Sequence, residues 1–150
     1  MSISLDDSPS GAPSGHFRLE VYRRGELVDV YEEKNLIVDG SRQVHARLLG
    51  GDVTNRSVTQ ISFGTSATAP APGNTTITNP FTKAVDNVTY PATNQVRFSF
   101  SLGTSESNGR AISEFGLLTA GGVLYARRTR STPLNKDSDI TLSGTWTISF

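Results

Sequence analysis

The sequence predicts an all-β protein: a single-domain β-sandwich or jelly-roll-like barrel with one short helix and a flexible N-terminal arm. Three observations predict this class. Ser and Thr, which are typical of turns and strands, make up 35 of the 150 residues. Several short segments alternate apolar and polar residues, as strands with one buried face do. Gly and Pro residues separate these segments, and the length fits one domain.

Residues 1–16 are expected to form a polar arm, and residues 17–150 the β-sandwich domain. The first fifteen residues are rich in Ser, Pro, Gly and Asp, a composition that buries too little apolar surface to offset the entropy of ordering. Two interpretations stay open: a disordered tail, or an arm that becomes ordered on a neighbouring subunit. The acids and the missing apolar stretch argue against a signal peptide, and no stretch of the sequence is apolar enough to predict a membrane span.

A hairpin is expected to open the domain. Apolar and polar residues alternate from Phe17 to Val21, which is the period of a half-buried strand. Arg24-Gly25 is a typical turn pair, and the apolar run Leu27–Tyr31 then returns as the second strand.

One short helix of about two and a half turns is predicted within Ser41–Gly51, since polar cap residues precede it and a Gly pair ends it. Val44 and Leu48 lie four residues apart and share a face. Because isolated helices of this length are marginal, these two residues are expected to hold the helix against the sheet. His45 points away from this face and is interpreted as a solvated histidine.

The second half of the chain is predicted to be one strand after another, for a total of seven or eight strands. These strands lie around Ile61–Phe63, Val96–Leu102, Ile112–Leu118, Val123–Arg130 and Ile140–Phe150. Their inward faces, with that of the opening hairpin, supply the predicted core: Phe17, Leu19, Val21, Ile61, Phe63, Val96, Phe98, Phe100, Ile112, Leu117, Trp146 and Ile148.

Three features are candidate subunit interfaces. The sixteen residues Thr65–Pro80 show no periodicity, and a long loop that contains Pro70 and Pro72 is expected to be functional or to lie along a partner. The final strand runs to Phe150 without a charged residue to prevent edge pairing with another subunit. An arginine cluster is expected at the surface, paired with acids of the same or a neighbouring subunit: Arg127, Arg128 and Arg130.

The sequence predicts no enzyme, no cofactor and no metal site. It has no Cys, which excludes thiol catalysis and Cys-based zinc sites. It has no Gly-x-Ser-x-Gly or phosphate-binding glycine motif, and His16 and His45 lack metal-ligand spacing. Asp137 and Asp139 could offer oxygens to Ca²⁺, but the loop around them lacks the remaining ligands. Equal numbers of basic and acidic residues, 14 each, argue against a nucleic-acid or anionic-membrane partner.

Several motifs together resemble small structural proteins of tailed bacteriophages. They are NLIVDG, an R-x-x-x-A-R-L-L-G-G helix, ISFGTSATAPAPGNTTITNPF, SESNGRAISEFGLLTAGGVLYARR, Lys136 and a closing ITLSGTWTISF strand. The I-x-E-x-G-L strand and the G-x-L-x-A-R return strand are also similar to the domain that attaches tail fibres to phage baseplates. The resemblance covers about Asn35–Phe150.

The resemblance implies a non-enzymatic structural protein of a tailed-phage virion, assembled in the host bacterial cytoplasm. We expect an oligomeric minor capsid or decoration protein, a homotrimer that binds the major capsid protein and stabilises the outside of the head. The alternative is a tail or baseplate component that acts as an adaptor for tail fibres. The extra hairpin Phe17–Tyr31, and the lack of a shaft sequence after Phe150, depart from the fibre-attachment pattern and favour the head.

Two further hypotheses remain. A module that binds carbohydrate or a host receptor needs exposed aromatic residues on loops, and the candidates Tyr90 and Phe81 are interpreted as packing residues. An enzyme is the weakest hypothesis, and it would need a pocket with convergent titratable groups.

Overall fold

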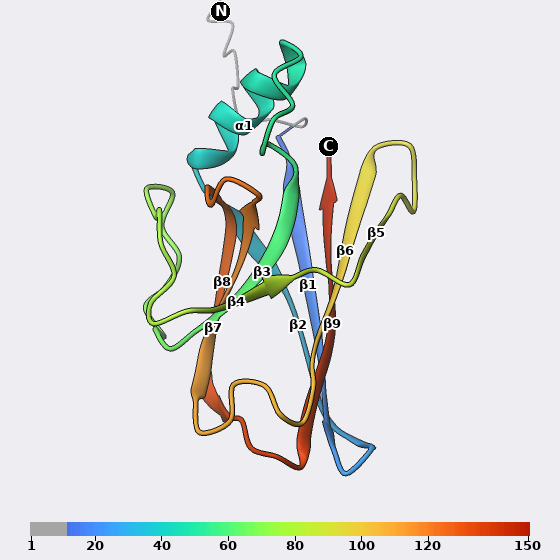
Figure 1. Cartoon of the computed structure of the whole chain (residues 1–150), viewed down its shortest axis with the longest axis vertical. Coiled ribbons are helices and arrows are strands. Elements are labelled where there is room, and N and C mark those ends of the chain that lie inside the picture. The colour runs from blue at the N-terminus through green and yellow to red at the C-terminus, as the bar shows by residue number, and fades with distance from the viewer. Residues whose placement is uncertain (1–11) are drawn as a thin grey trace, which may run out of the picture.

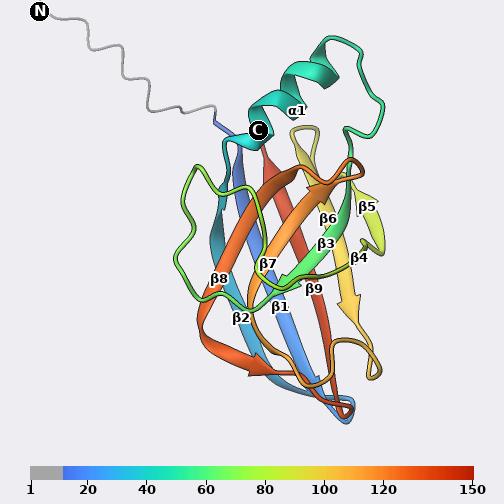
Figure 2. The same ribbon diagram turned by 60° about the vertical axis from the view of Figure 1, so that its left-hand side comes forward.

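The computed structural model describes residues 12–150, which form nine antiparallel strands in one curled, half-barrel sheet and a single helix (Figures 1 and 2). The predicted all-β class is therefore confirmed. The elements are β1 Ser14–Arg23, β2 Glu26–Ile37, α1 Gly40–Leu49, β3 Val58–Gly64, β4 Phe81–Ala84, β5 Asn87–Thr89, β6 Gln95–Leu102, β7 Ala111–Thr119, β8 Leu124–Asn135 and β9 Ile140–Ser149. In the described part of the chain, no helix is both long and apolar enough to cross a membrane.

The strands follow the order β4-β3-β7-β8-β2-β1-β9-β6-β5 around the sheet. Its two halves meet at a short seam, because β2 pairs with β8 only through Leu36 and Ile37. On the opposite side the chain passes directly from β4 to β5. There Val85 donates its backbone N–H to Thr59 at 3.0 Å, and Asp86 donates to Ser99 at 2.7 Å. These bonds tie the two ends of the sheet together.

The first hairpin forms as predicted. Arg24 and Gly25 have φ values of 52° and 81°, the left-handed pair that a two-residue hairpin turn requires. β1 begins at Ser14, however, so the sheet domain starts before the predicted boundary at Phe17, and His16 lies in a strand rather than in the arm. The rest of the predicted arm, residues 1–11, lies outside the described residues.

The final strand is central, and the prediction of an open edge there is wrong. β9 pairs with β1 on one side and with β6 on the other along most of its length. Both rows of its backbone groups are therefore occupied within the chain. Phe150, which follows β9, donates its backbone N–H to Asn94 at 2.9 Å.

Nine strands exceed the predicted seven or eight because the strands β4 and β5 have no clear sequence signature. They have four and three residues, and every residue of β5 is exposed. Without a buried face, such a strand shows no apolar alternation, so its formation depends on neighbouring strands rather than on its own residues.

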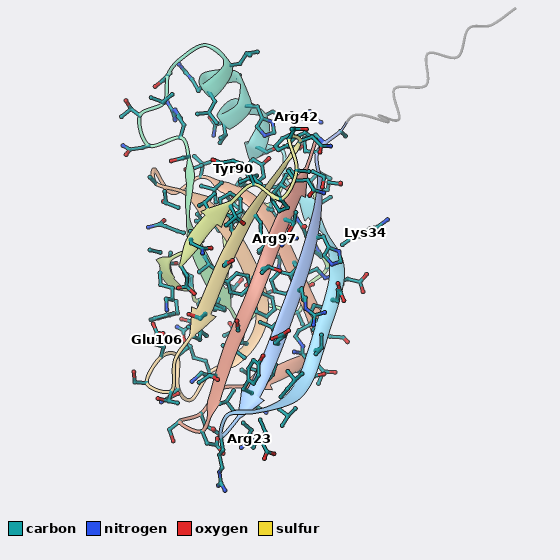
Figure 3. All side chains as sticks on the ribbon, turned by 90° about the vertical axis from the view of Figure 1, so that its right-hand side faces the viewer. Arg23, Lys34, Arg42, Tyr90, Arg97 and Glu106 are labelled. Atoms are coloured by element: carbon teal, nitrogen blue, oxygen red, sulfur yellow. The ribbon has the colours of Figure 1, made fainter. Side chains whose placement is uncertain are left out.

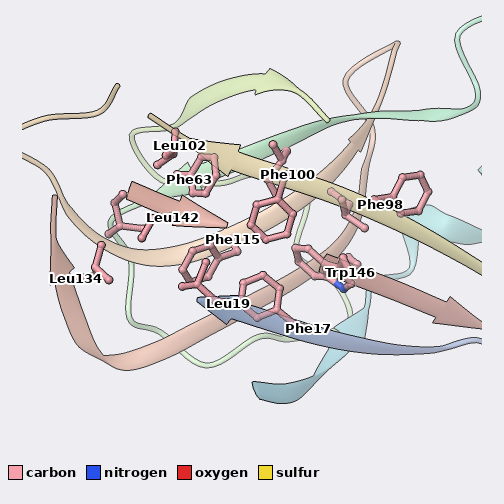
Figure 4. Packing of buried hydrophobic residues seen from close by; sticks show 14 of the residues in the cluster. Phe17, Leu19, Phe63, Phe98, Phe100, Leu102, Phe115, Leu134, Leu142 and Trp146 are labelled. Atoms are coloured by element: carbon pink, nitrogen blue, oxygen red, sulfur yellow. The ribbon is translucent and has the colours of Figure 1, made fainter. Parts of the chain in front are cut away.

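The core fills the inside of the curled sheet, and Figure 4 shows its centre. The Phe17 ring lies 4.7 Å from that of Phe115 and 4.9 Å from that of Trp146, measured between centroids. The predicted core residues are buried except Val96, which is partly buried against the cluster. Gly144 lies against the Phe100 ring, where a Cβ would overlap it.

The helix α1 crosses one end of the barrel, where β9 ends (Figure 1). Val44 is 2 % exposed and holds α1 to the core as predicted, but Leu48 is 40 % exposed and does not bury. The neighbouring Leu49 is 92 % exposed. The start of the helix is fixed by the backbone, since Asp39 donates its N–H to the Pro72 carbonyl at 2.8 Å.

Candidate functional site

An apolar groove of about 350 Å³ lies beneath α1, and it is the strongest candidate for a functional site in the described residues. Helix α1, the start of β3, the β5–β6 hairpin and the end of β9 form its walls. Its volume is at the lower end of the range of ligand pockets in proteins. Its size fits one or two apolar side chains of a partner.

Exposed apolar side chains gather at this groove. Val88, Tyr90 and Phe150 are 41 %, 76 % and 52 % exposed and line it together with the half-exposed Leu48. Figure 3 shows Tyr90 projecting below α1. Tyr90 is thus a surface residue, and its interpretation as a packing residue is wrong. Phe81 is partly buried against the core as expected. A contiguous exposed apolar patch of this kind is typical of an interaction site.

A histidine–tyrosine pair supplies two of the polar groups on the wall of the groove. His45 Nε2 lies 2.8 Å from the Tyr125 hydroxyl, at hydrogen-bond distance, and the His45 ring also packs edge-on against Phe150. Burial lowers the pKa of His45 and raises the pKa of Tyr125 to about 12. Both groups are therefore neutral at pH 7. His45 is therefore not the fully solvated residue expected from the sequence: it is partly buried, and its ring is bonded to Tyr125.

The groove walls are mostly apolar, and their polar groups are the neutral His45–Tyr125 pair together with Arg56, Ser57 and Thr59. Such a lining suits the recognition of an apolar side chain with polar groups beside it. We therefore treat the groove as a binding surface.

Arg127, one of the predicted interface residues, is buried inside the chain. Its Nε donates to Glu114 Oε2 at 2.7 Å, and the two side chains are only 4 % and 1 % exposed. Arg127 Nη1 also donates to Asn74 Oδ1 at 3.0 Å. This prediction is corrected: the strand turns Arg127 inward to a carboxylate, so it is not available to a partner.

The same carboxylate fixes the long loop Thr65–Pro80. Glu114 Oε1 accepts the backbone N–H of Thr78 at 2.9 Å and that of Ser66 at 3.3 Å. Ile77 of this loop is buried and packs against Gly116, where a Cβ would lie 2.7 Å from its side chain. The loop is thus held by its own chain. Pro70 is partly exposed and Pro72 exposed, so both stay at the surface.

Arg128 and Arg130, the other two predicted interface arginines, lie at the seam between β2 and β8. Arg128 donates to the Tyr31 hydroxyl at 2.8 Å and to the Lys34 carbonyl at 3.0 Å, and Arg130 donates to Asp29 at 3.3 Å. Both guanidinium groups lie over the Tyr31 ring, 5.8 and 5.2 Å from its centroid. The groups that accept these hydrogen bonds all belong to the same chain. Pairing within the same subunit is one of the two arrangements expected from the sequence, and pairing with a neighbouring subunit is the other.

Several other titratable residues form contacts within the chain. His16 pairs with Glu32 at 2.7 Å, and Asp139 pairs with Arg23 at 2.7 Å. The buried Lys136 amine donates to Asn108 and to the Asp137 carbonyl, and burial lowers its pKa. Within residues 12–150 no cluster of three or more His, Asp or Glu side chains could hold a metal ion.

Comparisons of this chain with protein-family models, with curated proteins and with solved structures find no match.

Proposed function

We propose that this chain is a non-enzymatic structural protein of a tailed-phage virion that binds the outside of the head and stabilises it. The observation that carries the proposal is the groove beneath α1, because its exposed apolar side chains suit contact with another protein. A decoration protein binds neighbouring subunits of the phage head and so helps the head to resist its internal pressure. This role needs apolar contact surfaces and does not need catalytic residues. Many copies on one particle would multiply a modest affinity per contact.

The strand motifs that resemble those of virion proteins support the proposal. In I-x-E-x-G-L the acid is Glu114, which pairs with Arg127 of the return strand, and the glycine is Gly116, which makes room for Ile77. These residues hold the loop Thr65–Pro80 to the sheet, so the motif encodes an internal contact. The same motif also resembles the fibre-attachment pattern. It therefore favours, as the second candidate, a tail or baseplate adaptor for fibres.

A substitution of one residue in the groove tests the proposal. Tyr90→Ala removes the most exposed aromatic side chain of the groove without touching the core. We expect this variant to fold normally and to bind phage particles assembled without the chain at least about tenfold more weakly, as loss of an interface anchor does. Leu49→Ala is the matched control, because Leu49 is 92 % exposed on α1 but does not line the groove.

Binding can be measured by co-sedimentation of the purified variants with such particles. Equal binding of the Tyr90→Ala variant and the wild type would show that the groove is not the contact surface. Binding to detached tails instead of heads would favour the adaptor function.

A further inference from the structure

A buried lysine lies against an asparagine side chain at the end of the barrel away from α1 (Figure 1). Lys136 follows β8 and is 1 % exposed. Its Nζ donates to Asn108 Oδ1, in the loop between β6 and β7, at 2.9 Å and to the Asp137 carbonyl at 3.0 Å. A buried lysine usually pairs with a carboxylate. Both acceptors of this amine are instead neutral, and one of them is an amide that an amine can attack.

The backbone holds the two side chains in this contact. Gly109 donates its N–H to the Lys136 carbonyl at 2.9 Å, and Lys136 donates its N–H to the Arg110 carbonyl at 2.9 Å. The Asn108 amide is also oriented, because its Nδ2 donates to the Thr104 carbonyl at 2.9 Å. Its oxygen therefore faces the amine, and its nitrogen faces a second acceptor. Two reacting groups that are held in one orientation react far faster than the same groups free in solution.

We propose that the Lys136 amine and the Asn108 amide react with each other and form an amide bond between the two side chains, an isopeptide bond. The lone pair of Nζ attacks Asn108 Cγ, the Nζ–Cγ bond forms, and the Cγ–Nδ2 bond breaks. The proton that Nζ gives up leaves with Nδ2, so the by-product is ammonia. The reaction consumes no oxidant and no other reactant. The Thr104 carbonyl, which accepts a hydrogen bond from Nδ2, stabilises the leaving nitrogen.

The reaction requires the neutral amine, because a protonated amine has no lone pair. Burial lowers the pKa of Lys136 and so increases the neutral fraction at pH 7. The negative charges of Asp137, Glu106 and Asp139 act in the opposite direction, and Glu106 is itself paired with Lys83 at 2.9 Å. Since ammonia leaves the site, a small neutral fraction is enough for the reaction to proceed.

The bond connects the β6–β7 loop to the β8–β9 loop, so it closes a covalent ring that contains β7 and β8. A cross-link of this kind restricts the unfolded chain as a disulfide does. It does not depend on the redox state, and the chain has no Cys with which to form a disulfide. The inference goes beyond the proposed function and does not rest on it.

Mass spectrometry of the purified full chain tests the bond. Loss of ammonia lowers the intact mass by about 17 Da, and trypsin no longer cuts after Lys136, whose amine has become an amide. Trypsin still cuts after Arg97, Arg110 and Arg130. We therefore expect residues 98–110 and 131–150 to appear joined in one peptide.

Three variants accompany the wild type. Lys136→Arg removes the attacking amine and Asn108→Ala removes the amide, so both should keep the full mass and give separate peptides. Asn108 is exposed, so its substitution leaves the fold intact even if Lys136→Arg destabilises the chain. Lys34→Arg is the matched control, because Lys34 is an exposed lysine on β2, and this variant should still lose ammonia and give the joined peptide.

Full intact mass of the wild type, with cleavage after Lys136, would overturn the proposal. A loss of ammonia that persists in Lys136→Arg would overturn it as well, because cyclisation of Asn108 on the Gly109 nitrogen releases ammonia without the lysine. None of these measurements uses phage particles, so the proposed function is tested independently.

Discussion

Replacing Glu114 with alanine removes the acid that neutralises a buried arginine. Arg127 would keep its charge in a site where its side chain is 4 % exposed and where its other contact is the neutral amide of Asn74. Loss of one partner of a buried ion pair costs about 3–5 kcal/mol. The backbone N–H groups of Ser66 and Thr78 lose their acceptor as well. For a domain of this size we expect the melting temperature to fall by about 6–20 °C.

Two control variants distinguish loss of the buried ion pair from a general loss of stability. In Glu114→Met combined with Arg127→Met both charges are gone, so this double variant should be more stable than Glu114→Ala although the two N–H groups stay unpaired. Arg23→Ala breaks an exposed pair with Asp139 and should cost no more than about 1 kcal/mol. Urea unfolding gives the free energies. A loss below about 1 kcal/mol in Glu114→Ala would refute the role assigned to the pair.

Two further predictions concern the core and the groove. Trp146→Ala should cost about 3–5 kcal/mol, because Trp146 is fully buried between β1 and β6; an unchanged melting temperature would contradict this position. Burial lowers the pKa of His45 in the folded chain, whereas in the unfolded chain it keeps its ordinary value of about 6.5. Below that pH the unfolded chain binds a proton more readily than the folded chain, so the free energy of unfolding falls as the pH falls. His45→Gln should reduce the loss of melting temperature between pH 7.5 and pH 5.5, and an identical loss in variant and wild type would count against a partly buried, neutral His45.

Alternating strands were predictable because burial of one face imposes a period of two. This holds for β6 and β9, where Phe98 and Trp146 are buried, as the alternation predicts. Alternation does not reveal which strands are neighbours. The sequence therefore indicated an open edge at β9, whereas β9 pairs with β1 on one side and with β6 on the other, and the strands at the ends of the sheet are β4 and β5.

The charged and apolar site residues were harder to predict, because one residue's position depends on a distant partner. Alternation places Arg127 on the opposite face from Arg128, but only the register of β7 and β8 shows that Glu114 shares its side. A carboxylate within the apolar ISEFGLL strand was a usable signal for such a pair. No local signal exists for the groove, since α1, β5 and the chain end meet there only in the folded protein.

Immunogold labelling of this protein on intact phage particles tests the proposed function most directly. Gold particles are counted separately over heads and over tails, with particles assembled without the chain as the background. We expect label spread over the outside of the heads. Label confined to the tail tip would contradict the head-binding function and favour the fibre adaptor, and particles without label above background would contradict a structural role in the virion.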